Sequence, residues 1–305
     1  MLSNDTQTSG VLINPPAHTL GQVNAIYSGS SRHHVVENYS GPLSVKSMLS
    51  GAAFWHTGSG AQRVHSRSFL VLNRGTKYSL VMDSPVPART FVLFFRDGFV
   101  EEIHRSLVTA PETLMDRPFD RALPTYFVEA IQPAAEAGVG RALDRVRQVW
   151  QGGGSSLSLE DEFHHVAVEL LRLRHVTSRM LASVAVSRAS TRQELFRRTQ
   201  RARVMIEDSF REALPLEKLA CEACLSPAHF HRSFQDFYGV TPHHYLTQVR
   251  LREAARLLET TDQPITSVCA KTGFESVPSF SNLFRSRFRT SPGRFRALAG
   301  KSKIR

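Results

Sequence analysis

Two cysteines three residues apart, Cys221 and Cys224, are the first feature of the sequence whose spacing suggests chemistry. A C-x-x-C pair can be half of a structural zinc site, a redox-active dithiol, or two small residues on a helix. A structural zinc site needs four ligands, typically two such pairs, and Cys269 is the only other cysteine. A redox-active pair normally begins a helix in a βαβ context. The sequence therefore favours a structural role for both cysteines, with redox sensing and metal binding as the alternatives.

A second candidate set for chemistry lies nearer the N-terminus and consists of His33, His34, Glu37, His56 and His65. Imidazole and carboxylate groups bind a metal only when they converge on one point. Two adjacent histidines on a strand point to opposite faces of a sheet, so they do not converge. We therefore expect no metal, no cofactor and no catalytic group in this region, and a small organic effector is the more natural ligand.

The elements that carry these histidines are predicted to be strands. Residues from about 20 to 105 contain short apolar runs separated by turn residues, which predicts a β-sandwich or barrel. The turn Asn-Arg-Gly at 73–75 divides residues 63–82 in the manner of a hairpin. The run TFVLFF at 90–95 suits a buried strand.

Two helices are predicted next, over residues of about 125–150 and 158–184, with Ser158 as the N-cap of the second. Apolar residues recur along one side of the second helix at Phe163, Val166, Leu170, Leu173 and Met180. This stripe, interrupted by the polar Thr177, packs on the protein's own sheet or, alternatively, forms a dimer seam.

A length of 305 residues suggests two domains. The polar stretch SRASTRQ at 187–193 is the expected boundary, which gives a β-rich domain with a helical annex over 1–190 and an all-α domain over 196–300. No run of about 18 apolar residues occurs, so no membrane span is expected. The first ten residues lack a secretory pattern, and three cysteines fit a reducing compartment, so we expect a cytoplasmic protein.

The all-α region contains an internal repeat. Leu216, Leu219 and Ala220 match Ile265, Val268 and Cys269 at an offset of 49, whereas Phe230, Phe234, Pro242 and Tyr245 match Phe280, Phe284, Pro292 and Phe295 at an offset of 50. The one-residue difference falls in a turn, where an insertion is tolerated.

Each copy has the pattern of a short helix, a tight turn and a second helix. Ser226 is an N-cap followed by proline, and Gly273 serves the turn of the second copy. Residues 241–262 predict one long helix whose apolar side packs against both copies. This arrangement is a helix-turn-helix unit present twice. In this frame Cys224 occupies a site for a small, semi-buried residue, and Cys221 lies on the outer side of the first helix.

Residues of about 200–298 resemble the DNA-binding domain of the AraC/XylS family of bacterial transcriptional regulators. The resemblance rests on the pieces LA…A-C-LS (219–226), F…F…YG-x-TP-x-x-Y (230–245), RL-x-x-A-x-x-LL-x-x-T (250–261), I-x-x-V (265–268), GF (273–274), F-S-x-x-F (280–284) and SP-x-x-F-R (291–296). Three residues depart from the family pattern: Arg289 replaces a glycine, Asn282 replaces a frequent basic residue, and Cys269 replaces a small alanine.

The β-rich region resembles, more weakly, the cupin-like sensor domain that precedes many such DNA-binding domains. Metal-binding cupins usually present two histidines separated by one residue and followed by a glutamate, and this pattern is absent here. The resemblance therefore implies a fold of two parts, a cupin-like N-terminal domain and an all-α C-terminal domain with two helix-turn-helix units.

The charge supports an anionic partner. The chain carries a net charge of +11; residues 201–305 hold 17 basic and 10 acidic residues, or +7. The resemblance implies that double-stranded promoter or operator DNA is this partner, and that the second helix of each unit reads it. The DNA-binding candidates are Ala228, His231, Arg232, Gln235, Pro278, Ser279, Ser281, Asn282, Arg285, Arg287 and Arg294.

We expect a sequence-specific transcriptional regulator, commonly an activator, that is not an enzyme. Further expected partners are a small-molecule effector, a second copy in a homodimer, and RNA polymerase if the protein activates. One alternative is a cupin-type metalloenzyme with an appended DNA-binding module. A nucleoid protein that binds DNA without sequence preference is another.

Overall fold

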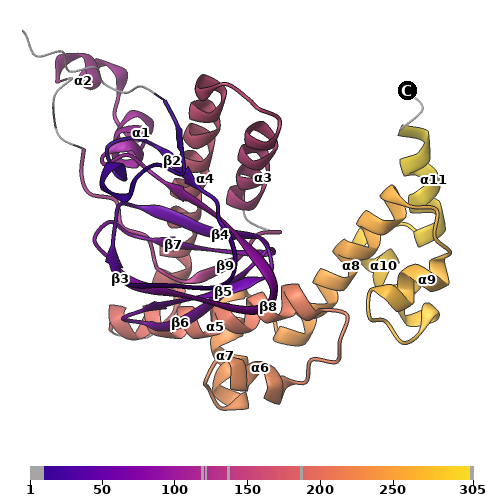
Figure 1. The fold of residues 1–305 in the computed structure, drawn as a ribbon. Coiled ribbons are helices and arrows are strands. Elements are labelled where there is room, and N and C mark those ends of the chain that lie inside the picture. The colour runs from indigo at the N-terminus through magenta and orange to yellow at the C-terminus, as the bar shows by residue number, and fades with distance from the viewer. Residues whose placement is uncertain (1–9, 118–119, 121, 136–137, 186–187, 303–305) are drawn as a thin grey trace, which may run out of the picture. The chain divides into compact units, whose positions relative to one another are not determined.

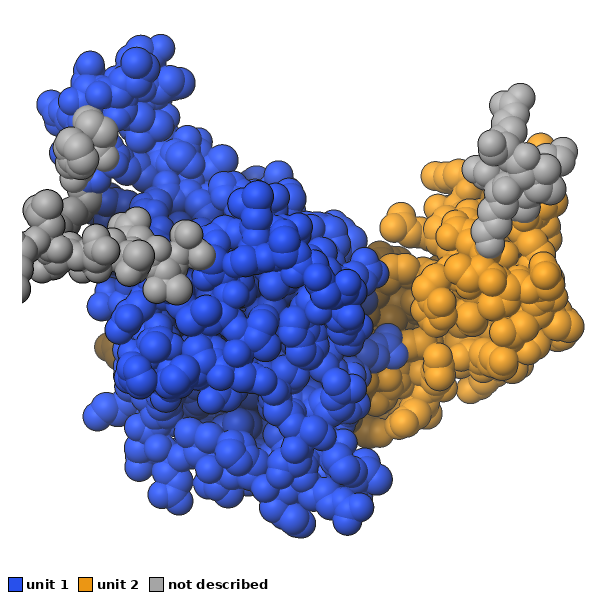
Figure 2. Space-filling view, turned by 45° about the horizontal axis from the view of Figure 1, so that its top comes forward, with its two compact units in different colours: residues 1–182 blue, residues 183–305 orange. Residues whose placement is uncertain are grey.

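The computed structural model describes residues 10–117, 120, 122–135, 138–185 and 188–302 (Figure 1). The chain divides into two compact units, residues 1–182 and 183–305, which Figure 2 shows in separate colours. The first unit is β-rich with helices added to it, and the second consists of helices. This confirms the predicted fold class. No helix in the described residues is long and apolar enough to cross a bilayer.

The described part of the first unit contains one sheet of nine strands. The strands are β1 (Leu12–Ile13), β2 (Ala25–Tyr27), β3 (Ser30–Ser40), β4 (Ser44–Ser50), β5 (Ala52–Thr57), β6 (Gly60–His65), β7 (Ser68–Leu72), β8 (Lys77–Phe94) and β9 (Ile131–Pro133). They run in the order β1-β2-β8-β4-β7-β9, and β3 and the β5–β6 pair are also attached to β8.

The long strand β8 organises this sheet. Its first half, from Lys77 to Asp83, pairs with β3 and β5, and its last residues pair with β2 and β4. Pro85 and Pro87 lie between the two paired segments. Proline has no amide hydrogen, so at these unpaired positions no hydrogen bond between strands is lost. The runs that the sequence divides into separate strands are therefore parts of one strand.

The predicted hairpin at residues 73–75 is wrong. β7 and β8 flank this turn, but both pair with β4, which lies between them. A tight hairpin occurs instead between β5 and β6, where Thr57 pairs with Gly60 across the two residues Gly58 and Ser59. Turn residues report a change of chain direction, but they do not determine which strands become neighbours.

The helices of the first unit are α1 (Phe99–Val108), α2 (Pro111–Asp116), α3 (Gly138–Gln151) and α4 (Ser156–Ser183), with a short 3-10 helix, η1, at Ala17–Thr19. The predicted helix over 125–150 is too long, because residues 122–130 form neither helix nor strand and β9 follows them. Ser158 is not the N-cap of α4: the Ser155 hydroxyl accepts a hydrogen bond from the Ser158 amide, one turn earlier.

Helices α3 and α4 pack on one face of the sheet. Phe163, Val166 and Leu170 of α4 share a core with Phe91 and Leu93 of β8, and Leu173 packs at its edge. Thr177, which interrupts the stripe, is also buried. Of the two interpretations of the α4 stripe, the structure therefore shows packing on the protein's own sheet for these residues.

The second unit contains α5 (Ala189–Ser209), α6 (Leu216–Glu222), α7 (Pro227–Tyr238), α8 (Pro242–Thr260), α9 (Ile265–Lys271), α10 (Val277–Phe288) and α11 (Pro292–Ser302). The polar stretch 187–193 is helical from Ala189 onward, so its described part is not a break in structure. The exposed residues at 189–191 begin α5, and a polar helix end of this kind has the same composition as a linker, so composition alone does not distinguish the two.

The second unit has two hydrophobic cores, one for each repeat. The first holds Phe230 and Phe234 of α7 with Tyr245, Leu246 and Val249 of α8. The second holds Phe280 and Phe284 of α10 with Leu251, Ala254, Leu257 and Leu258 of α8. The two halves of α8 thus serve different cores, as the long predicted helix requires.

Candidate nucleic-acid interface

The second helix of each repeat, α7 or α10, begins with a serine cap. Ser226 and Ser276 accept hydrogen bonds from the amides of His229 and Ser279, both at 3.4 Å. The next helices repeat this pattern, with Thr241 capping α8 and Ser291 capping α11. The repeat seen in the sequence is therefore also a repeat of helix starts, and it fixes where each candidate recognition helix begins.

The turns before α7 and α10 have the same hydrogen bonds. The amides of Cys224 and Leu225 donate to the carbonyls of Cys221 and Ala220, both at 2.9 Å. In the second copy the amides of Gly273 and Phe274 donate to the carbonyls of Ala270 and Cys269. Both are Schellman motifs, whose first residue after the helix has a left-handed backbone.

Cys269, which replaces a small alanine, is buried, whereas Cys224 is exposed rather than semi-buried as predicted. Cys224 has φ +52° and Gly273 has φ +81°, so the two residues share the left-handed position. This position follows the end of the helix, where a side chain points away from the core. Only the pairing of Cys224 with Gly273 in the repeat could have signalled this conformation.

The candidate residues of the first repeat lie on the side of α7 opposite its buried phenylalanines. Ala228, Arg232 and Gln235 are exposed, and His231 is half-buried. Phe230, Phe234 and Phe237 are buried on the other side. The predicted division of α7 into a polar outer face and an aromatic inner face is therefore present.

The second repeat places its candidates in the same way. Pro278, Ser279, Asn282, Arg285 and Arg287 of α10 are exposed, Ser281 is half-buried, and Arg294 is exposed in the first turn of α11. Arg289, which replaces the expected glycine, ends α10 with φ +60°, and its amide donates to the Arg285 carbonyl at 2.8 Å. The helix therefore ends at the position that the resemblance implies, despite the side chain.

The guanidinium groups on these surfaces are unengaged. Within the described residues, the side chains of Arg232, Arg285, Arg287 and Arg294 make no hydrogen bond or ion pair. Arginines of the scaffold behave differently: Arg252, for example, pairs with the buried Glu207 at 2.6 Å. An unpaired, exposed guanidinium is available to a phosphate or to a guanine edge.

The two surfaces differ in their charged groups. Around α7 and the start of α8 the exposed or half-buried side chains include His229, His231, His243 and His244. At the matching positions around α10 and α11 stand Ser279, Ser281, Gly293 and Arg294. Arg285 and Arg287 of α10 replace Gln235 and Phe237 of α7, so the permanent positive charge concentrates on the second repeat.

A buried polar network connects α8 to α5. The Glu207 carboxylate, which is 2% exposed, accepts hydrogen bonds from the Tyr245 hydroxyl at 2.7 Å and from Arg252. The Arg203 Nε donates to the same Tyr245 hydroxyl at 2.9 Å. Because each partner comes from a different turn of α5 or α8, the network fixes the angle at which α8 supports the first repeat.

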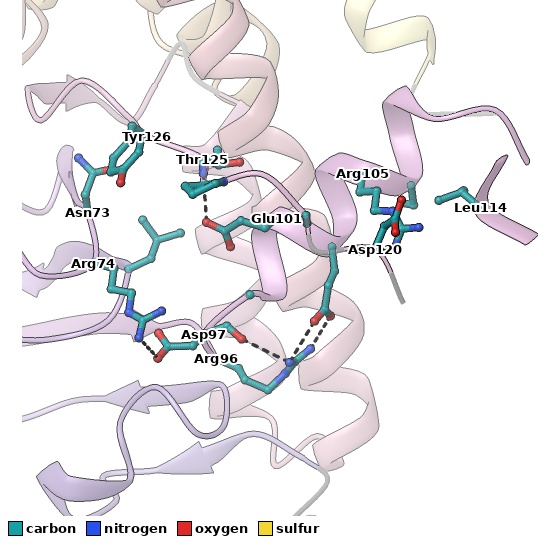
Figure 3. Close-up of a pocket in the computed structure, with 16 residues that line it drawn as sticks. Asn73, Arg74, Arg96, Asp97, Glu101, Arg105, Leu114, Asp120, Thr125 and Tyr126 are labelled. Carbon is teal, nitrogen blue, oxygen red and sulfur yellow. Dashed lines mark hydrogen bonds and ion pairs between the residues drawn. The ribbon is translucent and has the colours of Figure 1, made fainter. Parts of the chain in front are cut away.

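The first unit has a cavity of about 760 Å³ beside α1 and α2 (Figure 3). Its wall includes three arginines and four acids, and these groups pair among themselves. Arg74 meets Asp97 at 3.1 Å, Arg96 meets Glu102 at 2.7 Å, and the Thr125 amide donates to Glu101. Because acids and arginines are mixed in this wall and several of them pair with each other, its charge does not select an anionic or a cationic ligand.

The histidine set is not brought together as a ligand set. His33 pairs with Asp83 at 2.8 Å on the surface of the sheet, His34 and His56 are exposed, and His65 is buried and accepts a hydrogen bond from the Arg67 amide. Across the described ranges, no group of three or more His, Cys, Asp or Glu side chains is arranged to hold a metal ion.

Lys46 of β4 is a buried cationic residue that sequence analysis missed. It is 1% exposed, and its Nζ lies 2.8 Å from the Tyr78 hydroxyl and over the rings of Tyr78 and Phe94. Burial lowers the pKa of the Lys46 amine well below its usual value and raises the pKa of the Tyr78 phenol. The sequence feature that could have indicated this buried amine is a lysine inside the otherwise strand-forming run SVKSM.

Comparison with known proteins gives one family match, a helix-turn-helix domain over residues 219–298. The chain is 37% identical over 87 residues to the HTH-type transcriptional activator RhaS of Klebsiella pneumoniae, covering 28% of this chain and 31% of that protein. It is 35% identical over 94 residues to the bifunctional transcriptional activator/DNA repair enzyme AdaA of Bacillus subtilis, covering 31% of this chain and 44% of that protein. The match thus spans less than half the length of either relative.

Solved structures also align with this chain. The DNA-binding domain of AdpA, a global transcriptional factor in complex with a target DNA, is 28% identical and covers 35% of this chain and 96% of that one, with a TM-score of 0.34. An AraC-type regulator of Chromobacterium violaceum is 28% identical over 37% of this chain and 96% of that one, with a TM-score of 0.33. Fatty acid-bound ToxT of Vibrio cholerae aligns with 91% of this chain and 96% of its own, at 13% identity and a TM-score of 0.35.

Proposed function

Because residues 219–298 form an AraC-type helix-turn-helix domain, we propose that the chain is a sequence-specific transcriptional regulator that binds duplex DNA. The observation that carries this proposal is the matched pair of recognition helices. Each has an aromatic face in its own core and a polar face with an unengaged guanidinium group. In the mechanism, α7 and α10 enter successive faces of the major groove, about 34 Å apart along the duplex.

The two helices have different roles in this proposal. Arg232 and His231 read base edges in the first half-site, and Gln235 and Ala228 extend the same face. In the second half-site Ser279, Ser281 and Asn282 read bases through neutral hydrogen bonds, beside Pro278.

The positive charge of the second repeat serves mainly to hold the DNA backbone. Arg285, Arg287 and Arg294 contact phosphates, which position the protein but carry no sequence information directly. The concentration of unengaged arginines on α10 and α11 supports this division.

The first unit is the sensing part of the proposed regulator. It binds a small-molecule effector or forms a homodimer, in a cytoplasmic protein that contacts RNA polymerase when it activates. The cavity beside α1 supports an effector site because it is large enough for a small organic molecule. The domains of function are residues 1–190 and 196–300.

Salt dependence of DNA binding tests the proposal. The structure begins α5 at Ala189, so the fragment to test is residues 183–305. Its affinity for duplex DNA should fall with salt with a log–log slope of roughly −4 to −7, as expected when about 5–8 phosphates are neutralised. A slope near zero, or no DNA retained at low salt, contradicts a nucleic-acid interface.

A further inference from the structure

Cys221 and Cys224 carry the only exposed thiols in the described part of the chain. Cys269 provides an internal contrast: it is buried, its Sγ lies 3.6 Å from the Phe274 carbonyl, and burial raises the pKa of its thiol. A reagent in solution therefore reaches the first two thiols and not the third. Exposure of this kind is a requirement for a reactive cysteine.

The turn between the two cysteines brings their backbones close together. The Cys224 amide donates to the Cys221 carbonyl at 2.9 Å, which closes a four-residue turn. Such a turn keeps the terminal Cα atoms within about 7 Å, and a disulfide spans Cα separations of about 4.4–6.8 Å. The Cα separation of such a turn is therefore compatible with a disulfide, and closing it requires a local shift of Cys224.

Neither thiol is needed to build the turn. At the matching positions of the second repeat stand Ala270 and Gly273, and they form the same Schellman motif with the same hydrogen bonds. Cysteine is moreover a poor choice at position 224, because a left-handed backbone costs a residue other than glycine about 1–2 kcal/mol. The two thiols are therefore not required for the fold of this turn.

We propose that Cys221 and Cys224 are a redox-active dithiol whose oxidation to a disulfide lowers the DNA affinity of the first helix-turn-helix unit. This inference rests on the proposed DNA-binding function. With a peroxide as oxidant, one thiol attacks the O–O bond and becomes a sulfenic acid, with release of one water. The second thiol then attacks that sulfur, the S–O bond breaks, and a second water leaves. Two thiols and one hydrogen peroxide give one disulfide and two waters.

The disulfide acts on DNA binding through the start of α7. The Cys224 carbonyl accepts a hydrogen bond from Arg198 at 3.2 Å, and the Leu225 amide bonds to Ala220. Ser226, the cap of α7, follows directly. Drawing the two sulfur atoms together moves Cys224 and disturbs these contacts, so the first turn of α7 shifts. Oxidation should therefore weaken binding to the half-site that α7 reads by about tenfold, the scale of one lost base contact.

The test uses the full chain and a duplex selected from random DNA by the reduced protein. Hydrogen peroxide is added, the Cys221–Cys224 peptide is identified by mass as two hydrogens lighter, and the DNA affinity is measured before and after a dithiol reductant. We expect the crosslink, unmodified Cys269, and a reversible loss of affinity of about tenfold. Failure of the reduced protein to select any DNA would instead contradict the proposed function itself.

Two variants take the residues of the second repeat. Cys221→Ala and Cys224→Gly should bind the selected DNA as the reduced parent does, and peroxide should leave their affinity unchanged. The inference is overturned if the parent forms no Cys221–Cys224 disulfide, if the disulfide forms without a change in affinity, or if either variant responds to peroxide as the parent does.

Discussion

Cys224 and Gly273 occupy the same position of the two helix-turn-helix repeats, and both have a left-handed backbone, with φ of +52° and +81°. Each is the residue that follows a short helix and donates its amide to a carbonyl three residues earlier. The same backbone is thus built once from the residue that tolerates it best and once from a residue that it strains. This difference can be measured.

Cys224→Gly should stabilise residues 183–305 by about 1 kcal/mol, because glycine relieves the left-handed strain. The larger conformational entropy that glycine gives the unfolded chain offsets part of this gain. The opposite change, Gly273→Ala, should cost more than about 2 kcal/mol, since the added Cβ would also lie 2.9 Å from the Arg211 carbonyl oxygen. Urea unfolding of the fragment measures both. Equal and small effects of the two changes would show that the strain assignment is wrong.

Arg289→Gly should also stabilise the second unit by about 1 kcal/mol, because Arg289 ends α10 at φ +60°. Gly239 ends α7 at φ +70°, and a Cβ there would meet no atom within 4 Å. Gly239→Ala should therefore cost only the backbone strain, about 1 kcal/mol, which makes it a matched control without a steric component. Destabilisation by Arg289→Gly in the absence of DNA would show that the arginine makes a stabilising contact.

The two arginines Arg232 and Arg285 should separate base reading from phosphate binding. Arg232→Ala should weaken binding to operator DNA by about 1–3 kcal/mol, with a small effect on random DNA and relaxed preference at one base pair. Arg285→Ala should weaken all sequences by a similar factor and reduce the salt slope by about one unit. Titrations of operator and scrambled duplexes at several salt concentrations compare them, and the reverse outcome would assign the roles the other way.

Lys46 should make the stability of the first unit depend on pH. Burial lowers its pKa in the folded state, so between that lowered value and the usual lysine value of about 10.4 the unfolded chain binds more protons. Unfolding free energy should therefore rise with pH across this window, by up to about 1.4 kcal/mol per pH unit for one proton. Lys46→Met should remove this rise, as measured by urea unfolding of the full chain from pH 6 to 10.

The hydrogen bond from Lys46 to Tyr78 provides the control for that experiment. Tyr78→Phe should destabilise the first unit by about 1–3 kcal/mol, because it leaves the buried amine without its partner. The double variant Lys46→Met with Tyr78→Phe, which removes both polar groups, should be more stable than Tyr78→Phe alone. Additive effects of the two changes would indicate that the pair does not interact.

The helical repeat could be predicted from sequence because its information is local. The cap Ser226, the proline after it and the spacing of Phe230 and Phe234 act within a few residues of each other, and helix formation uses such contacts. The polar outer faces of α7 and α10 follow directly from the same periodicity. The left-handed backbone of Cys224 was missed, because cysteine carries no intrinsic signal for it.

Tertiary structure alone decided the organisation of the first unit. Insertion of β4 between β7 and β8, and the pairing of Ile131–Pro133 with β7, join segments that are distant in sequence, so no local pattern encodes them. The burial of Lys46 could not be predicted for the same reason, because it depends on Tyr78 and Phe94, which are 32 and 48 residues away in the sequence. Sequence by itself thus determined the two helices that we propose bind DNA, whereas long-range strand pairing determined the order of the sheet and the burial of the Lys46 amine.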